Sequence, residues 1–353
     1  MNIIHTQYHV NDFFSQQDEY QEKWRLPGTR LPLEKINEFD ILKLMSQKPS
    51  LIIISGPTCA GKTDVAIALA EPVGGEIISA DAMQVYKHMD IGTAKPTEQQ
   101  RARVRHHLID VVNPDETFSA AIFARMADGV IEGVHQEGRP VFVVGGTGLY
   151  IKALTQGLFP AQEQGGGIRK GLKKEAETLG PEVLHKRLQE VDPAAAARIH
   201  PNDKYRIIRA LEVHEVTGQP ISHHQRVHGF QDIRYSTLKI GLTLDREVLY
   251  DRINTRVDQM LASGLLEEVK WLLDHGYSST LKSMQSIGYR HMVVYLEQRI
   301  AWAETVRLFK RDTRRYAKRQ LTWLRADPEI LWVQPTQIDV MCQKIDAFLT
   351  GGV

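Results

Sequence analysis

Cysteine is scarce in this sequence, and so are long hydrophobic runs and any excess of one charge. Two cysteines in 353 residues exclude a disulfide framework and a cysteine metal cluster, which is typical of a reducing compartment. No apolar stretch reaches membrane-spanning length, and the N-terminus lacks the pattern of a secretion signal. We therefore expect a cytoplasmic protein outside membranes. With 44 basic and 43 acidic residues, any polyanion must be bound by a local patch.

The strongest local signal is the run LIIISGPTCAGKT at residues 51–63. Its first four residues are apolar, which predicts a strand buried on both faces of a parallel sheet. The glycines with Lys62 and Thr63 then match the phosphate-loop spacing G-x-x-x-x-G-K-[ST]. Backbone amides and a helix N-terminus would bind oxyanions, Lys62 would add charge, and Thr63 would ligate Mg²⁺. The predicted phosphate-binding residues are Gly56, Pro57, Thr58, Cys59, Ala60, Gly61, Lys62 and Thr63.

Buried-strand patterns recur along the chain and alternate with helical ones. We predict strands at residues 76–80, 108–112, 140–144, 238–244 and 330–333, with helices between them. The expected fold is α/β, a P-loop NTPase-like parallel sheet core flanked by helices, with a helical insertion domain. We assign 49–159 and 237–353 to the core, 160–236 to the insertion, and 1–48 to an extension that is flexible or lies upstream of a start at Met45.

Asp81 is the first candidate for chemistry. It follows the predicted strand 76–80, and in doubly wound sheets ligands bind at that edge. The strand at 140–144 ends instead in Gly145-Gly146-Thr147, where a nucleotide hydrolase usually carries an acidic residue for magnesium. The machinery for ATP hydrolysis is therefore not evident, although a small-molecule kinase could still use Asp81. His106 and His107 have no partners at ligand spacing, so we interpret them as packing or surface residues.

Basic residues concentrate in one predicted helix at residues 301–325. This helix contains eight basic residues and only two acidic ones, and Tyr316 and Trp323 could stack on bases. Such a run is usually a solvated face, but in a nearly neutral protein it favours a track for nucleic-acid phosphates. In the insertion, Arg206 and Arg209 stand at helical spacing, and a solvated face or a polyanion contact would explain them equally well. The basic residues of the first helix are Arg307, Lys310, Arg311, Arg314, Arg315, Lys318, Arg319 and Arg325.

Seven motifs in order make the chain resemble the tRNA dimethylallyltransferase family after Pro49. They are GPTCAGKT, ISADAMQVYKHMDIGTAKP, HHLID, VGGTGLY, EVDPAAAARIHPNDKYRIIRALEV, IGYR and AKRQLTWLR. The resemblance implies transfer of a dimethylallyl group from dimethylallyl diphosphate to the exocyclic 6-amino nitrogen of an adenine. That adenine lies immediately 3′ of the anticodon, in tRNAs reading codons that begin with U. The phosphate loop would then hold the diphosphate of the donor, and the partners would be that donor and the tRNA anticodon stem-loop.

The resemblance also implies roles for individual residues. Asp81, Thr147 and Arg290 would be catalytic, Thr63 would ligate Mg²⁺, and the protein would act as a monomer. Asp81 would accept the proton of the adenine amine, since charge on the leaving diphosphate is stabilised elsewhere. The tRNA contacts that it implies are Asp81, Ala82, Met83, Gln84, Tyr205, Arg206, Ile207, Ile208, Arg209, Gln285, Ser286, Ile287, Gly288, Tyr289, Arg290, Arg314, Lys318, Arg319, Gln320, Trp323 and Arg325.

Two readings from other classes stay open at this point. A phosphoryl-transferring small-molecule kinase would share the phosphate loop and Asp81 but would leave the basic helix without a purpose. A non-catalytic RNA-binding module would explain the basic helix but not Lys62, Thr63 and Asp81. Turnover of ATP or of dimethylallyl diphosphate, with and without tRNA, separates the three.

Overall fold

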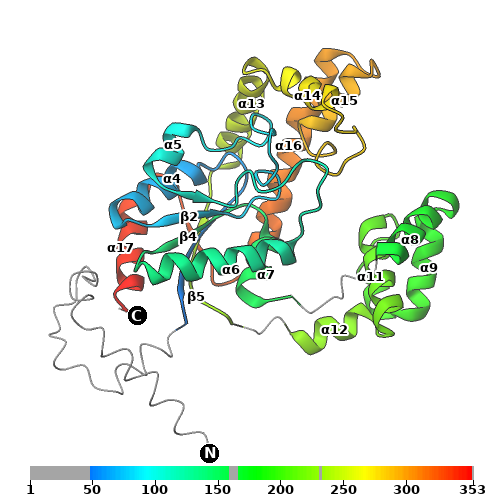
Figure 1. Cartoon of the computed structure of the whole chain (residues 1–353), viewed down its shortest axis with the longest axis horizontal. Helices are drawn as coiled ribbons and strands as arrows, with labels where there is room; N and C mark the ends of the chain where they lie inside the picture. Colours follow the sequence, from blue (N-terminus) through cyan, green and yellow to red (C-terminus); the bar gives the residue numbers. More distant parts are fainter. Residues whose placement is uncertain (1–47, 159–165, 230–232, 352–353) are drawn as a thin grey trace, which may run out of the picture. The chain divides into compact units, whose positions relative to one another are not determined.

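The computed structural model describes residues 48–158, 166–229 and 233–351, which form two compact units (Figure 1). The first unit holds the sheet and contains residues 48–117, 127–146 and 236–351. The second is helical and takes the described residues of 118–126 and 147–235. Apart from Lys48, the predicted extension and the alternative start at Met45 lie outside the described residues. The boundaries of an insertion at 160–236 stay a prediction.

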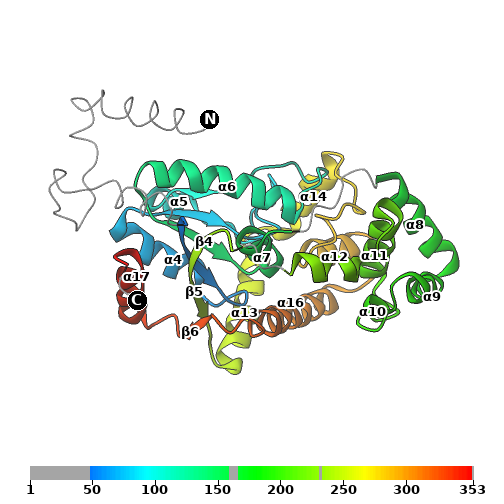
Figure 2. The ribbon, with the colours of Figure 1, turned by 90° about the horizontal axis from the view of Figure 1, so that it is seen from below.

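Among the described residues, six parallel strands form one sheet in the order β3-β2-β4-β1-β5-β6, of which Figure 2 labels β4, β5 and β6. Each of β1, β2 and β4 is almost wholly buried; the apolar runs of β1 and β4 predicted this, whereas β2 also buries the polar residues Glu76 and Ser79. Parallel strands place all their carboxyl ends at one edge, so the segments that follow β1, β2 and β4 share it. The α/β fold class is thereby confirmed. The strands are β1 (Ser50–Ser55), β2 (Glu76–Ser79), β3 (His106–His107), β4 (Val141–Gly145), β5 (Ser236–Leu242) and β6 (Leu331–Val333).

The predicted strand at 108–112 is wrong. Strand β3 stops at His107, because Leu108 and Asp110 have positive φ angles of 59° and 57°. The backbone there pairs instead with the loop after β2: the Asp110 amide donates to the Gln84 carbonyl, and Val112 bridges to Tyr86. His107 donates to or accepts from Glu76 at 2.5 Å within the sheet.

Helices α4 (Lys62–Ala70) and α17 (Ile338–Leu349) pack on the sheet face that presents Ile52, Ile54 and Ile240. The remaining helices of this unit are α5 (Glu98–Arg103), α13 (Arg246–Ala262), α14 (Leu265–Asp274), α15 (Tyr289–Leu296) and the long α16 (Trp302–Leu324), with the short 3₁₀ helix η2 (Glu71–Val73) after α4. Helix α6 (Ala120–Gln136) begins in the second unit, where the Ser119 hydroxyl caps it by accepting from the Ile122 amide. Among the described helices, none is both long and apolar enough to cross a bilayer.

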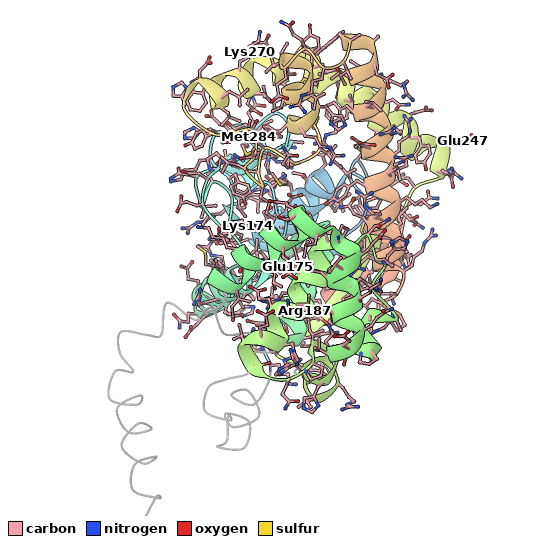
Figure 3. All side chains as sticks on the ribbon, turned by 90° about the vertical axis from the view of Figure 1, so that its right-hand side faces the viewer. Lys174, Glu175, Arg187, Glu247, Lys270 and Met284 are labelled. Atoms are coloured by element: carbon pink, nitrogen blue, oxygen red, sulfur yellow. The ribbon has the colours of Figure 1, made fainter. Side chains whose placement is uncertain are left out.

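The second unit has a hydrophobic core of its own, built mainly by α8, α9 and α11. Helix α8 starts at Gly166, inside the glycine-rich run QEQGGGIRKG. Burial of Leu172 and Ala176 offsets the low helix propensity of the glycines. Arg187 lies between Glu175 and Glu215 and ties α9 to α8 and α11 (Figure 3). These helices are α7 (Gly148–Gln156), α8 (Gly166–Leu179), α9 (Pro181–Val191), α10 (Pro193–Ala196), α11 (Lys204–Thr217) and α12 (Ile221–His228).

Candidate active site

The phosphate loop leaves β1 at Gly56 and enters α4 at Lys62. Gly56 has a φ angle of 152°, and a Cβ atom there would lie 2.9 Å from the Leu242 carbonyl oxygen. Cys59 also has a positive φ, 65°, so the loop turns through the left-handed region before the helix. This curled backbone is the geometry that the glycine spacing predicted.

Not every backbone amide of the loop is available to a ligand. The Thr58 amide donates to Gln320 Oε1 at 2.9 Å, and the Ala60 amide donates to the Pro57 carbonyl at 3.3 Å. The first intrahelical bond of α4 runs from the Val65 amide to the Gly61 carbonyl, so the amides of the first helical turn have no partner inside the helix. Among the predicted residues 58–63, the backbone amides of Cys59 and of residues 61–63 are therefore the ones left for an anion.

Lys62 is poised inside this loop. Its Nζ donates to the Pro57 carbonyl at 2.8 Å and to the Gly56 carbonyl at 3.1 Å. Burial lowers the pKa of Lys62 to about 8, an effect that the charge of Asp81 opposes and that of Arg256 reinforces. Within the described residues, the hydrogen bonds of this ammonium group go to carbonyl oxygens. An anionic ligand would stabilise its charge, as expected for the lysine of a phosphate loop.

Asp81 directly follows Ala80 at the carboxyl end of β2. Its Oδ1 accepts from the Met83 amide at 2.8 Å and from the Gln84 amide at 3.4 Å, which fixes the carboxylate in a turn. Within the described part of the chain, Oδ2 has no hydrogen-bond donor. Burial, and then the charge of Asp81, raise the pKa of the Tyr316 hydroxyl, so Asp81 acts on both α16 and Lys62. One oxygen thus orients the group while the other can meet a substrate.

The turn after Asp81 is braced by Gln84. The Ser79 hydroxyl donates to Gln84 Oε1 at 2.9 Å, and Gln84 Nε2 donates to the carbonyls of Thr93 and Ala94. Ala82 and Met83 are half-buried in this turn. The predicted tRNA segment 81–84 therefore has a structural function in holding the loop at residues 90–96, and the half-buried Asp81 is its ionisable group.

Glu268 on α14 holds that same loop against the IGYR segment. Its carboxylate accepts from the amides of Asp90, Ile91 and Gly92 at 2.8–3.2 Å and from the Tyr289 hydroxyl at 2.5 Å. Tyr289 is fully buried, so the side chain that we expected to contact tRNA packs inside the unit instead. The segment still positions Arg290, the next residue.

Arg290 donates to Asp312 Oδ2 at 2.8 Å, next to His291. Although burial acts to raise it, hydrogen bonds from Arg311 and Arg290 hold the pKa of Asp312 down at about 2. Arg290 is therefore a charged, oriented group and 39% of its side chain is exposed. In the rest of the segment, Gln285 is exposed, Ile287 is half-buried, Gly288 is buried, and the Ser286 hydroxyl is a buried atom without a hydrogen bond among the described residues.

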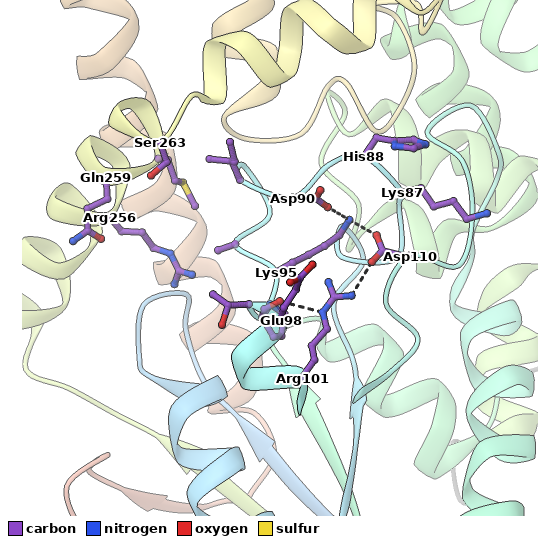
Figure 4. A pocket seen from close by; sticks show the side chains of 15 residues that line it. Lys87, His88, Asp90, Lys95, Glu98, Arg101, Asp110, Arg256, Gln259 and Ser263 are labelled. Atoms are coloured by element: carbon purple, nitrogen blue, oxygen red, sulfur yellow. Dashed lines mark hydrogen bonds and ion pairs between the residues drawn. The ribbon is translucent and has the colours of Figure 1, made fainter. Parts of the chain in front are cut away.

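Two arginines on α13 join the site, and sequence reasoning missed them. Arg252 Nη1 lies 3.9 Å from the position that a Cβ of Gly61 would take, and Arg256 lowers the pKa of Lys62. Arg256 also lines a cavity of about 840 Å³ (Figure 4). On its other side, Lys95 lies between Asp90 and Asp110, at 2.5 Å from each. The four-residue spacing of Arg252 and Arg256, on a helix that follows a predicted strand, was the sequence signal that could have identified them.

Most cations of α16 are already paired. Arg307 pairs with Glu304, Lys310 with Asp258, and Arg311 with Asp312, while Arg314 Nη1 donates to Asn254 at 2.6 Å. Arg319 lies over the Tyr316 ring at 5.8 Å. Lys318 and Arg325 are exposed and have no ion pair within the described residues. Trp323 is 42% exposed, whereas Gln320 is 7% exposed.

In the second unit, the expected tRNA contacts divide by burial. Tyr205 is 74% exposed on α11, and Arg206 pairs with Asp203 at 3.4 Å. Arg209 pairs with Glu212 at 2.8 Å. Ile207 and Ile208 belong to the core of the unit, which leaves their side chains unavailable to RNA. Thr147 follows Gly146 in the chain and is the N-cap residue of α7.

Comparison with known proteins supplies the family. A sequence profile described as IPP transferase matches residues 84–327. The chain is 50% identical over 303 residues to a tRNA dimethylallyltransferase of Geobacter metallireducens, covering 86% of this chain and 98% of that protein. It is 54% identical over 286 residues to a tRNA dimethylallyltransferase of Desulfosudis oleivorans, covering 81% and 91%.

Solved structures agree. A full-length tRNA isopentenylpyrophosphate transferase from Bacillus halodurans is similar with a TM-score of 0.64 and 42% identity, covering 86% of this chain and 98% of that one. A eukaryotic dimethylallyltransferase acting on tRNA gives a TM-score of 0.68 and 29% identity, covering 84% and 77%. The motifs, the sheet and these relatives lead to one conclusion: the chain belongs to the tRNA dimethylallyltransferase family.

Proposed function

We propose that this enzyme transfers the dimethylallyl group of dimethylallyl diphosphate to the exocyclic 6-amino nitrogen of the adenine immediately 3′ of the anticodon. The tRNAs would be those that read codons beginning with U. One observation carries the proposal: a carboxylate, Asp81, and a phosphate-loop lysine, Lys62, lie at the same sheet edge, and the charge of Asp81 acts to raise the pKa of Lys62. A kinase would need Lys62 as well. A base next to this lysine is, in addition, what transfer to an amine requires.

The chemistry divides between these groups. The bond from the allylic carbon to the diphosphate oxygen breaks, and the electron pair leaves with the diphosphate. The amides at the start of α4, Lys62 and the α13 arginines stabilise the charge that develops there. The adenine nitrogen forms the new bond to carbon, and Asp81 accepts the proton that the nitrogen loses. Thr147 and Arg290 belong to the proposed catalytic set as further stabilisers of the diphosphate.

A magnesium ion at this site would be held mainly by the diphosphate of the donor and less by protein side chains. Thr63 is half-exposed in the first turn of α4, whereas Asp64 accepts a hydrogen bond from Gln100 at 2.8 Å. No group of three acidic, His or Cys side chains that could hold a metal ion gathers anywhere among the described residues. Mg²⁺ commonly keeps its waters and binds one protein oxygen plus substrate phosphates. We propose Thr63 as that ligand, and the ion would neutralise diphosphate charge.

Recognition of tRNA is assigned to exposed groups in both units: Lys318, Trp323 and Arg325 on or after α16, and Tyr205 and Arg206 on α11. An unpaired anticodon loop permits a base to leave its stack at low cost. Because a tRNA presents one anticodon loop, a single chain suffices, and we propose a cytoplasmic monomer.

Incubation with labelled dimethylallyl diphosphate, magnesium and an unmodified tRNA transcript tests the proposal. Label is expected in the tRNA, and replacement of the adenine 3′ of the anticodon by guanosine should abolish it. ATP offered in place of the donor should not be consumed. Turnover of ATP without tRNA would indicate a kinase instead, and tight tRNA binding without any label transfer would leave only an RNA-binding module.

A further inference from the structure

Gln320 is the buried polar residue of α16 closest to the phosphate loop. Its Oε1 accepts from the Thr58 amide at 2.9 Å, and its Nε2 donates to the Gly146 carbonyl at 3.1 Å. The side chain is 7% exposed, whereas Lys318 and Arg319 beside it are exposed. Both polar ends of the amide are therefore used inside the protein.

The two groups that Gln320 joins leave neighbouring strands. Thr58 lies in the loop after β1 and Gly146 follows β4, and the paired strands end with Ser55 opposite Gly145. Beyond that point the sheet no longer supplies partners for the backbone. A side chain from a third element satisfies one donor and one acceptor there, and so fixes the spacing of the two loops. Leaving such buried groups unpaired is costly.

Gly146 is complementary to this arrangement. A Cβ atom at Gly146 would lie 2.0 Å from Nε2 and 3.2 Å from Cδ of Gln320, the first distance closer than any real contact, and 3.3 Å from the Gly56 carbonyl oxygen. The glycine thus leaves the space that the glutamine amide occupies. Gln320 and Gly146 are far apart in sequence, but the hydrogen bond of Gln320 requires that residue 146 has no side chain.

We propose that Gln320 is a positioning residue of the donor site: by holding the Thr58 amide and the Gly146 carbonyl, it keeps the phosphate loop in its ligand-binding shape. The identity of the donor rests on the proposed function. The proposal replaces the expectation that Gln320 contacts tRNA. It separates α16 into exposed cations that face RNA and one buried amide that serves the diphosphate.

The decisive variant is Gln320→Leu, with Gln334→Leu as a matched control because Gln334 is exposed. Donor KM, binding of inorganic diphosphate with magnesium, and tRNA binding are measured separately. We expect donor KM and the diphosphate dissociation constant to rise together by about 10- to 100-fold, the usual cost of losing such bonds at a buried site. Binding of tRNA should change less than about threefold, within the range of a lost neutral contact.

A second pair of variants keeps the test sharp if Gln320→Leu folds poorly. Gly146→Ala should displace the amide and weaken diphosphate binding in the same way. In the Gln320→Ala background the clash is gone, so adding Gly146→Ala should cost little more, whereas independent sites would give additive losses. Additive losses would overturn the proposal, as would unchanged diphosphate binding or a selective loss of tRNA binding in Gln320→Leu.

Diphosphate binding also distinguishes this inference from the proposed function. If the wild-type enzyme transfers no dimethylallyl group but binds inorganic diphosphate through Lys62, the proposed function fails while the positioning of the loop can still be measured. If prenyl transfer proceeds and Gln320→Leu matches Gln334→Leu in every constant, only the inference about Gln320 fails.

Discussion

The phosphate loop and helix α16 both present positive charge, but they do so in opposite ways. The loop has one lysine, held by backbone carbonyls and lowered in pKa by burial. The helix has many cations on its surface, and most of them contact acidic or amide groups of the same unit. A cation whose hydrogen bonds, within the described residues, go to backbone carbonyls is suited to chemistry, whereas a partly neutralised exposed run is suited to reversible binding.

Replacement of Asp81, the proposed base beside the phosphate loop, should have the largest effect on the reaction. Asp81→Asn keeps the turn, because Oδ1 can still accept from Met83, but it removes the proton acceptor. We expect the single-turnover rate to fall about 100- to 10,000-fold, as for loss of a general base. Donor and tRNA dissociation constants should stay nearly unchanged.

A magnesium titration checks the role of Asp81. If the carboxylate acts as the base, excess metal cannot restore the rate of Asp81→Asn. Recovery of the rate at high magnesium would assign Asp81 to support of the ion instead.

Loss of the buried cation should come next in size. For Lys62→Ala we expect kcat/KM for the donor to fall about 100- to 1,000-fold, since a preorganised charge at the leaving group is removed. Lys344→Ala, at an exposed position on α17, is the matched control. Similar kinetics for both variants would contradict the assignment of the loop to the diphosphate.

Donor binding should also depend on pH through the same residue. Since the pKa of Lys62 is lowered to about 8, the free enzyme loses this charge as the pH rises past 8. Donor affinity should then fall by up to about tenfold per pH unit, because one pKa unit corresponds to one factor of ten. Calorimetry of diphosphate binding between pH 7 and about 9.5 measures it, and Lys62→Ala should show no such inflection near the pKa.

The lowered pKa of Lys62 also makes the stability of the free enzyme depend on pH. Stability should rise with pH, whereas donor affinity should fall. Between the lowered pKa of about 8 and the ordinary value of 10.5, the unfolded chain binds more protons at Lys62 than the folded one. This residue therefore contributes a rise in the free energy of unfolding with pH across that window. Denaturant unfolding of the wild type against Lys62→Ala isolates the contribution.

The helix side gives the smallest effects and sharpens the comparison within α16 itself. Lys318→Gln with Arg325→Gln removes cations without an ion pair in the described chain and should lower the salt slope of tRNA binding by about 0.7 to 0.9 per lost phosphate contact. Arg307→Gln with Lys310→Gln removes paired cations and should lower it less. Equal slopes for both pairs would mean that pairing does not decide which cations contact tRNA.

Local patterns predicted much of this molecule. The apolar runs of β1 and β4 and the glycine spacing of the phosphate loop each depend on neighbours in sequence, so the sequence alone could predict the structure they form. The strand expected at 108–112 failed because its backbone pairs with residues 84–86, a contact that no local period encodes.

The sequence by itself determined the fold class, the curled backbone of the phosphate loop and the position of Asp81 at the end of a strand. Only the tertiary structure decided which residues of the motifs face inward. Tyr289 meets Glu268, Ile207 and Ile208 fill a core, and Gln320 bonds to Thr58 and Gly146. A helix fixes which side chains share a face, but the direction that face takes depends on what packs against it from distant parts of the chain.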